Sequence, residues 1–521
     1  MGALDGAPDP IAKKVGACYI NASISMNNEP PSKPSNRLPF VRNWISLVGL
    51  IILLGSVFAF ILLFVFEFFA KRQNPYVGIL MFVVAPAFFV LGLFLMGLGR
   101  ILYRRQEAHA AGREFKPTFL IDLSNERHRR RLGILALGGV VFLLISAVGS
   151  HETYRITSSV QFCGQACHAP MEPQYVAYQH SPHSKVECTE CHIGSGTGNM
   201  LKAKLNGVHQ LVSMITGDYS KPTKLSGKIA INQSTCEQCH WPQRYVGNVE
   251  RSFNHYLADE TNSTFSVRLL LKVGGGDPTH GPPGGIHWHM NIGSKVEYIA
   301  TDAERQDIPW VRITHSNGEQ TEFRRPEFKD DTSKHNMHVM DCMDCHNRPA
   351  HQFRAPNDAV DLALYLGAIS TNLPNIKKEA VQALIGAAAT QTEGIQKIAE
   401  SMRKSYPARP EPEVKQAIAA VQDIYRLNFF PQMQADWRTH PNNIGHKDWP
   451  GCFRCHDGLH KTADGKKKLG ASDCNSCHII LAQGSGEELK KLSVNGHNFF
   501  HVDAPYSDFD CNKCHTGAIP R

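Results

Sequence analysis

The sequence predicts a mainly α-helical protein with three N-terminal transmembrane helices, a small β-containing insert and an irregular C-terminal part. Two observations support this fold class. Three long apolar runs lie before residue 150, and a short cysteine–histidine motif recurs seven times after residue 160. The expected parts are, in order, a cytoplasmic N-terminal segment (1–43), a three-helix membrane anchor (44–149), a three-motif domain (150–250), a β-containing region with a fourth motif (251–356), a helical insert (357–430) and a C-terminal three-motif region (431–521).

The expected anchor consists of the apolar runs Trp44–Phe69, Val77–Leu102 and Leu132–Gly149. A transmembrane helix needs about 20 apolar residues, so the third run is at the short end of the usual range. A buried soluble helix is the alternative for that run. The first run starts far from the N-terminus and is too long for the apolar part of a cleavable signal peptide.

The lysines and arginines indicate the orientation of the anchor. Loop 103–131 is strongly basic, which predicts that this loop and the N-terminal segment face the cytoplasm. Three spans then place everything after residue 150 on the opposite side, which is the periplasm if the membrane is a bacterial inner membrane. Many of the basic residues behind the net charge of +8 lie in this one loop, so the charge indicates membrane topology and not nucleic-acid binding.

The part after the anchor contains both strand-like and helix-like segments. Strand-like composition with Gly and Pro punctuation occurs at Thr264–Val273, Lys295–Ile299 and Trp310–Thr314. Helical apolar spacing occurs at Ala359–Ile369, Lys377–Ala389, Gly394–Lys404 and Glu413–Leu427. The motif-bearing segments show neither pattern clearly, and we expect them to be irregular.

Six C-x-x-C-H motifs and one C-x-x-x-C-H motif contain 14 of the 15 cysteines. C-x-x-C-H is the attachment motif for c-type haem. Its two thiols bond to the haem vinyl groups, and its histidine ligates the iron. A zinc site does not need a histidine after every second cysteine, and a bridge between such close cysteines would be redox-active and not a structural staple. We therefore predict seven covalently bound haem c groups.

The predicted haem-binding residues follow from the motifs. The attachment cysteines are Cys163, Cys167, Cys188, Cys191, Cys236, Cys239, Cys342, Cys345, Cys452, Cys455, Cys474, Cys477, Cys511 and Cys514. The iron-ligating histidines next to them are His168, His192, His240, His346, His456, His478 and His515. The first motif has one extra residue between its cysteines, which a helical turn can absorb.

Histidine is in excess, with 26 residues in the chain. This excess predicts that most haem irons have a second histidine ligand and transfer electrons without binding a substrate. The expected second ligands are His183, His255, His289, His338, His351, His446 and His501. The histidine pair in Gly284–His289 lies in a region without a motif, so we expect it to reach a haem that is attached elsewhere. Met171, three residues after the first motif, is a candidate thioether ligand that would raise the potential of the first haem. Simple packing against the porphyrin is the alternative for Met171.

Two segments resemble a known family. Phe-Cys-Gly-x-x-Cys-His-x-x-Met-x-Pro at 162–173 follows the anchor directly, and Val-Glu-Cys-Thr-Glu-Cys-His-Ile-Gly follows at 186–194. Together they look like the NapC/NirT/NrfH quinol-oxidising cytochromes over roughly residues 150–250. The length, the spans and the seven motifs look most like the seven-haem inner-membrane cytochromes of metal-respiring bacteria. The extra spans, the longer first motif and the long C-terminal haem regions depart from the small members of the family.

The resemblance implies a menaquinol site at the membrane surface, beside the first haem. It supports Met171 as a ligand of that haem, and it implies a lysine near the quinol, for which Lys202 and Lys204 are the candidates. It also implies a nearby acidic residue, for which Asp218 is the candidate. Quinol oxidation releases protons, so a base must lie within hydrogen-bonding distance. His209 could also serve, and snorkelling toward lipid phosphates is the alternative role of the two lysines.

These features predict a quinol dehydrogenase. Menaquinol from the inner-membrane pool would reduce the haem chain, and periplasmic multihaem cytochromes would accept the electrons in anaerobic or extracellular respiration. A terminal reductase of nitrite or hydroxylamine is an alternative, but it needs an iron with an open coordination site, and the excess of histidine and the absence of a C-x-x-C-K motif argue against one. An electron-transfer subunit of a larger respiratory complex remains open, as do a homo-oligomer and a membrane partner subunit.

Overall fold

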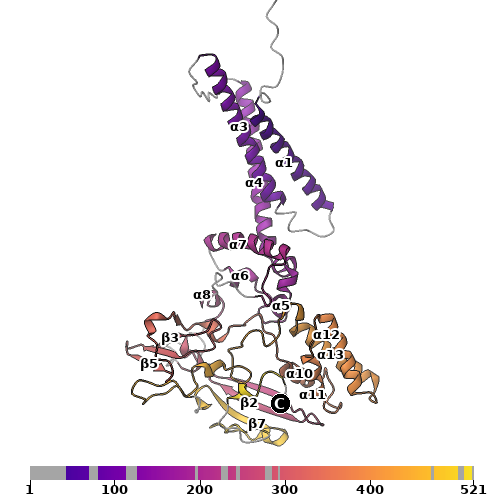
Figure 1. Cartoon of the computed structure of the whole chain (residues 1–521), viewed down its shortest axis with the longest axis vertical. Helices are drawn as coiled ribbons and strands as arrows, with labels where there is room; N and C mark the ends of the chain where they lie inside the picture. The colour runs from indigo at the N-terminus through magenta and orange to yellow at the C-terminus, as the bar shows by residue number, and fades with distance from the viewer. Residues whose placement is uncertain are drawn as a thin grey trace, which may run out of the picture. The chain divides into compact units, whose positions relative to one another are not determined.

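The fold was derived from a computed structural model of the whole chain (Figure 1). It is mainly helical with some sheet, as the sequence predicted. The chain divides into two compact units, Met1–Gly149 and Ser150–Arg521. The structure describes residues 43–69, 80–112, 126–193, 197–223, 233–241, 247–275, 284–290, 294–470, 474–502 and 510–518.

The first unit is built from long apolar helices. These are α1 (Trp44–Phe69), a π-helical turn (Leu80–Val84) that leads into α3 (Ala85–Ala110), and α4, which begins at Glu126 and ends at Ser158. Helices α1 and α3 pack closely because small residues line their contact. A Cβ atom at Gly99 would overlap Ser46, so only glycine permits this approach.

Two helical stretches in the described residues are long and apolar enough to cross a membrane, Trp44–Val65 and Leu80–Ala110. They include most of the first two predicted spans. The third predicted span, 132–149, lies within α4, which is 33 residues long. Several side chains of α4 lie outside the described residues.

Four helices form the largest hydrophobic core of the second unit. They are α10 (Pro356–Tyr365), α11 (Ile376–Ile385), α12 (Gln391–Ser405) and α13 (Glu411–Asn428), shown in orange in Figure 1. Proline near the start of α10 and α13 favours helix initiation, and the Thr390 side chain caps α12 by accepting from the Glu393 N–H. The helices bury one apolar face each against a common core. All four predicted helices of this region are confirmed to within a few residues.

Two antiparallel sheets lie in the same unit. In the first, the order is β1 (Val249–Tyr256), β2 (Thr264–Leu271) and β7 (His478–Gly484). Strands β2 and β7 lie side by side in Figure 1, although about two hundred residues separate them in the sequence. The first residue of β7 is the histidine of the sixth motif, and it pairs with Leu271. The sheet therefore fixes the position of one predicted iron ligand.

The second sheet has the order β5 (Gln320–Arg324), β4 (Trp310–His315), β3 (Ser294–Ile299) and β6 (Met337–Val339). Its buried residues include Val296, Tyr298 and Val311. Strand β6 ends three residues before Cys342, so the sheet positions the start of the fourth motif. The strands β2, β3 and β4 were predicted from the sequence, whereas β1, β5, β6 and β7 were not.

Candidate haem-binding sites

The cysteine–histidine motifs form short helical turns, and we number them 1 to 7 in chain order. Motifs 2 and 4 lie on α6 (Cys188–His192) and α9 (Cys342–Cys345), and motif 3 begins at the end of α8 (Gln233–Cys236). Motifs 5, 6 and 7 lie in 3₁₀ turns that begin at Gly451, Cys474 and Cys511. The described cysteines are thiols without disulfide bonds.

The first motif is in a π-helical turn, Phe162–Ala166. A π turn holds more residues per turn than an α turn, so it accommodates the extra residue between Cys163 and Cys167. A Cβ atom at Gly164 would overlap the ring of Tyr175 on α5 (His168–Gln179), so this close contact requires glycine. Despite its extra residue, the first motif thus forms a helical turn like the other motifs.

A common hydrogen bond fixes the shape of four motifs. The backbone N–H of the motif histidine donates to the carbonyl of the first cysteine at 2.8 Å for His240, His346 and His515, and at 3.1 Å for His456. Residues four apart in such a turn lie on the same side. The turn therefore presents the thiols and the imidazole of one motif to the same space.

Six of the seven motif histidines lie opposite a second histidine. The pairs and the distances between their ring centres are His192–His351 (6.0 Å), His240–His183 (6.0 Å), His346–His287 (6.5 Å), His456–His289 (6.0 Å), His478–His446 (6.2 Å) and His515–His501 (5.9 Å). In every pair the second histidine lies outside the motif. The same separation therefore recurs at six places.

This separation is the one that a haem iron requires. A bond between a metal and an imidazole nitrogen is about 2 Å long. Two imidazoles on opposite faces of one iron therefore have ring centres about 6 Å apart. Ordinary aromatic pairs have ring centres about 4.5–7 Å apart, so the recurrence of one separation at six motif histidines, and not a single distance, indicates haem sites. Each pair, with two thiols on the adjacent turn, has the donor set and the spacing of a haem c site with two histidine ligands.

Hydrogen bonds to the backbone orient three of the second histidines. The Nδ1–H of His351 donates to the Gln174 carbonyl at 3.0 Å, that of His183 to the Pro349 carbonyl at 3.2 Å and that of His289 to the Ile286 carbonyl at 2.7 Å. A carbonyl oxygen can only accept, so the proton must be on Nδ1 in each ring. The Nε2 atom is then left as a ligand, and such hydrogen bonds are typical of metal-binding histidines.

Burial disfavours the charged form of His351 and of five motif histidines. It lowers the pKa of His351 to about 4, against a smaller raising effect of the hydrogen bond to Gln174. Burial also lowers the pKa of the motif histidines His192, His346, His456, His478 and His515. A metal binds the neutral form of imidazole, so ligation competes with no proton near neutral pH.

Five of the second histidines that the sequence predicted lie in these pairs, namely His183, His289, His351, His446 and His501. His287 was not selected, although it shares the short 3₁₀ helix Ile286–His289 with His289. The two rings face different motif histidines. The I-H-W-H pattern in a segment without a motif was a signal for both residues.

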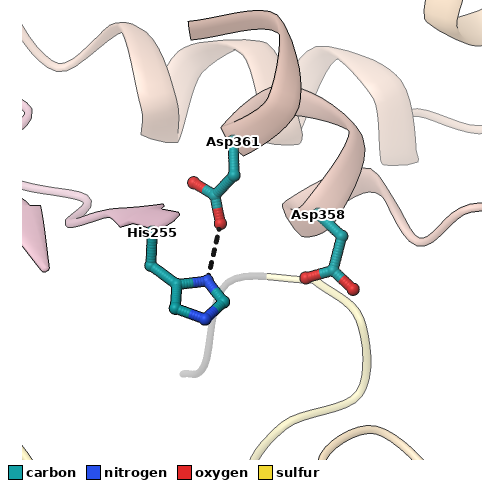
Figure 2. A group of neighbouring side chains, drawn as sticks. All are labelled: His255, Asp358 and Asp361. Atoms are coloured by element: carbon teal, nitrogen blue, oxygen red, sulfur yellow. Dashed lines mark hydrogen bonds and ion pairs between the residues drawn. The ribbon is translucent and has the colours of Figure 1, made fainter. Parts of the chain in front are cut away.

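The other two predicted second ligands contact different groups. The ring of His338 lies 5.3 Å from that of its cross-strand neighbour Tyr298. The His255 Nδ1 atom is 3.1 Å from Asp361 Oδ2, and Figure 2 shows this contact with Asp358 nearby. His338 packs against a buried sheet and His255 joins a charged cluster, so neither takes part in a ring contact with a motif histidine in the described part of the chain.

The cluster in Figure 2 has the composition of a metal site, since His255, Asp358 and Asp361 offer ligand atoms within 4.8 Å of one another. Two lysines already neutralise its carboxylates. The Lys377 ammonium binds Asp361, and the Lys447 ammonium binds Asp358. The two ammonium groups supply the positive charge that a metal ion would bring, so the cluster is an ion-pair network.

The residues predicted around the first haem are only partly described. The side chains of His168, Lys202 and Lys204 lie outside the described residues. Their backbones are helical, with both lysines on α7 (Thr197–Thr216). Met171 is partly buried on α5, one turn after His168, and Asp218 is exposed just after α7.

Successive motifs lie next to one another. Cys163 and Cys188 lie close together, which brings motifs 1 and 2 next to each other. Helix α6 contacts α8, and α8 contacts α9, so motifs 2, 3 and 4 follow in order. Cys236 and Cys342 also lie close together, which gives a second contact between motifs 3 and 4.

The later motifs continue this arrangement. Arg454 of motif 5 donates to the Asp344 carbonyl of motif 4 at 2.6 Å. Phe453, also in motif 5, stacks on His446 with ring centres 4.2 Å apart, and His446 is the partner of the motif 6 histidine. The backbone N–H of Gly517, two residues after motif 7, donates to Asp448 near His446. Each motif is thus linked to the next one in the chain.

Comparison with known proteins agrees with this arrangement. The N-terminal region of the NapC/NirT cytochrome c family matches residues 125–233. The chain is 38% identical to the cytochrome c-type protein ImcH of Geobacter sulfurreducens over 499 residues, which are 92% of this chain and 96% of that protein. No solved structure matches the chain.

Two further relatives match a shorter part. The cytochrome c-type protein TorC of Escherichia coli K12 is 31% identical over 22% of this chain and 34% of its own length. The cytochrome c-type protein NrfH of Wolinella succinogenes is 33% identical over 20% of this chain and 59% of its own length. The motifs, the histidine pairs and the match to ImcH over nearly its whole length lead to one conclusion: the chain belongs to the NapC/NirT family of multihaem c-type cytochromes.

Proposed function

We propose that this chain is a seven-haem cytochrome c that oxidises menaquinol in the bacterial inner membrane and passes the electrons to periplasmic multihaem cytochromes. The recurrence of one His–His separation beside six haem motifs carries this proposal. Irons with two histidine ligands have no open position for a substrate, so they serve electron transfer. Membership of the family supports the assignment to quinol-linked respiration.

The histidine pairs suggest specific axial ligands. We assign His351, His183, His287, His289, His446 and His501 as the second ligands in motifs 2 to 7, in that order. For motif 1 the candidate ligands are Met171, which the resemblance supports, and His168, whose side chain lies outside the described residues. A thioether ligand would raise the potential of the first haem above those with two imidazoles.

Quinol oxidation needs groups that take up protons. One menaquinol releases two electrons and two protons on oxidation, and the haem of motif 1 supplies the one-electron acceptor. We assign proton uptake to Lys202 and Lys204 on α7 and to Asp218 just after it, because these residues follow motifs 1 and 2 closely in the sequence. A base within hydrogen-bonding distance typically contributes about 10²–10⁴-fold to such a step.

The order of neighbouring motifs supports a single route for the electrons. Motifs 1 to 7 lie next to one another in chain order, through the Cys163–Cys188 contact, the α6, α8 and α9 turns, Arg454 and Phe453. We propose that electrons enter near motif 1 and leave near motif 7. The acceptor would then dock on the C-terminal part of the haem domain, in which His501 and His515 lie.

The proposed location follows from the anchor. We propose three spans, with 132–149 of α4 as the third, so that residues after 150 would lie in the periplasm, where haem is attached covalently. Two spans among the described residues support the anchoring itself. The basic loop 103–131 supports the orientation. A homo-oligomer or a membrane partner subunit is compatible with this arrangement.

The alternative of a terminal reductase has less support. Such an enzyme needs an iron with a free coordination position in a pocket with acid–base groups. The six histidine pairs leave no free position at those irons, and only the first haem has a different ligand set. The structure therefore favours electron transfer over reduction of nitrite or hydroxylamine.

The proposed function is tested with the detergent-purified, oxidised protein. A menaquinol analogue is added without oxygen, and the haem α-band is followed with time. We expect rapid reduction that a quinol-site inhibitor blocks. Full reduction by dithionite without any reduction by the quinol analogue would contradict the proposal and favour a missing partner subunit or a reductase.

The proposed proton-accepting residues are tested with the double variant Lys202→Ala and Lys204→Ala. We expect quinol oxidation to slow by about tenfold or more, with haem content unchanged, because a positioned base is lost while Asp218 remains. The matched control is Lys378→Ala with Lys404→Ala, which removes two exposed lysines of the helical insert. Equal rates in the two double variants would remove the proposed lysines from the quinol site.

A further inference from the structure

Motifs 4 and 5 are joined by a buried arginine. Arg454 is the residue before the second cysteine of motif 5, and its side chain is only 7% exposed. Its Nη2 donates to the carbonyl of Asp344 at 2.6 Å. Asp344 is the residue before the second cysteine of motif 4. The bond therefore joins equivalent positions of two haem-binding turns.

The remaining bonds of Arg454 fix the guanidinium plane. Nε donates to the Gly451 carbonyl at 2.9 Å, within its own turn, and Nη1 donates to the Arg305 carbonyl at 2.9 Å. All three acceptors are backbone oxygens. The flat guanidinium with its fixed N–H directions can satisfy such a set of acceptors, whereas a lysine ammonium has only one donor atom.

The acceptor on motif 4 is fixed as well. The Asp344 carbonyl also accepts from the Asn443 side chain at 2.9 Å. The buried Asp344 carboxylate accepts from the Tyr298 hydroxyl, from Arg305 at 2.9 Å and from the Asp341 N–H at 2.8 Å. These bonds hold motif 4 to strand β3 of the sheet. Arg454 binds motif 5 to motif 4, so the position of motif 5 relative to the sheet is fixed as well.

Among the described residues, the Arg454 guanidinium forms no ion pair with a protein carboxylate. In the part of the chain that the structure describes, no carboxylate lies within ion-pair distance of its guanidinium, and the Asp344 carboxylate pairs with Arg305 instead. A buried arginine usually lies beside an acid, because desolvating an isolated charge is costly. Here the charge lies between the attachment turns of two haems.

We propose that Arg454 is a positioning residue that fixes the spacing of the haems of motifs 4 and 5 and raises their reduction potentials. The proposal rests on the haem-binding part of the proposed function. Reduction removes one positive charge from a haem iron, so a nearby buried cation stabilises the reduced form. Electron transfer from the haem of motif 4 to that of motif 5 oxidises one iron and reduces the other, and a rigid link keeps their separation constant.

The test is a mediated redox titration of the full-length protein with three variants. Arg454→Gln removes the charge and retains a donor, and we expect two of the seven haems to titrate at lower potential. Arg454→Lys retains the charge, and we expect potentials close to those of the parent. The control, Arg312→Gln, removes an arginine on β4 whose charge Glu297 already neutralises, and we expect no shift. Low-spin ferric signals in electron paramagnetic resonance identify the haems that change.

Each result decides for or against the proposal. Unchanged potentials in Arg454→Gln with seven haems would overturn it, as would an equal shift in Arg454→Lys. Should Arg454→Gln lose haem, peptide mass spectrometry locates the loss. Loss confined to motifs 4 and 5 supports the link between them, and loss spread over all seven motifs refutes it. The titration uses chemical reductants, so its outcome does not depend on whether the protein oxidises quinol.

Discussion

The helical insert and the haem-binding turns are stabilised in different ways. Helix α11 of the insert buries Ile376, Lys377, Ala380, Val381 and Leu384, whereas the motif helices α6 and α8 bury none of their residues. The insert is an ordinary protein core of packed apolar side chains. The motif regions have backbone hydrogen bonds and histidine pairs but little apolar core. The helical insert is therefore stabilised by its own apolar core, whereas the motif regions need covalent haem to complete theirs.

The largest effect should come from preventing haem attachment. The full-length chain made without the c-type maturation machinery should keep slow amide exchange in α10 to α13 and lose it in the motif turns of α6 and α8, since these bury none of their own residues. Hydrogen–deuterium exchange with mass spectrometry measures both regions in one sample. Slow exchange in the motif turns without haem would show that these turns, like the insert, are stable without the cofactor.

The next largest effect concerns the buried charge pair of the insert. Asp361 and Lys377 are 5% and 1% exposed at their side chains, and Asp361 also binds His255 on β1. Asp361→Asn should cost about 3–5 kcal/mol of stability in the insert, because it leaves the Lys377 charge without a partner. Denaturant dependence of amide exchange measures this, and the haem spectrum should not change. The double variant with Lys377→Met should recover most of the loss.

The same pair predicts a pH dependence. Burial alone would raise the pKa of Asp361, but the His255 hydrogen bond and the Lys377 charge together hold that pKa below its usual value. A carboxyl with a lowered folded-state pKa stabilises the fold above its unfolded pKa of about 4 and loses this contribution as the pH falls through the folded value. The stability difference between the parent and Asp361→Asn should therefore be full at pH 7 and shrink in acid. A constant difference down to low pH would exclude this account.

The smallest expected effect comes from making the same Ile→Val substitution in each of the two regions. Ile398 is fully buried in α12, and Ile398→Val should cost about 0.5–1.5 kcal/mol. Ile444 lies two residues before His446 in a motif-bearing segment and is 59% exposed. Ile444→Val should change stability by less than about 0.5 kcal/mol. A larger loss at Ile444 than at Ile398 in thermal unfolding would show that the haem region depends on apolar packing after all.

Short-range patterns predicted much of this molecule. Helical spacing of apolar residues located α10 to α13, because a buried helix face repeats every three to four residues. Strands β2, β3 and β4 have clear strand composition. The strands β1 and β7 do not: β1 is mostly exposed, and β7 begins inside a haem motif. β1 forms a local hairpin with β2, whereas the pairing of β7 with β2 connects distant parts of the chain, for which local composition gives no signal.

The attachment residues could be read from the sequence because a haem c site needs two cysteines and a histidine within one helical turn. This requirement is local, so seven motifs identified the cofactor and most of the function. The family resemblance of residues 162–194 added the quinol hypothesis. The helical turns of the motifs, including the π turn of Phe162–Ala166, agree with that local requirement.

The second ligands were decided by the tertiary structure. The partner of a motif histidine must come from the opposite face of the haem. His183 lies 57 residues before its partner His240, whereas His351 lies 159 residues after its partner His192. No spacing rule covers both. The sequence around His338 and His255 does not distinguish them from the paired histidines. In the folded chain the His338 ring packs against Tyr298, and the His255 ring binds Asp361. The sequence by itself determined where the predicted haem-attachment motifs lie, since that pattern is local, and only the folded chain decided which histidines face them, since that depends on contacts between distant segments.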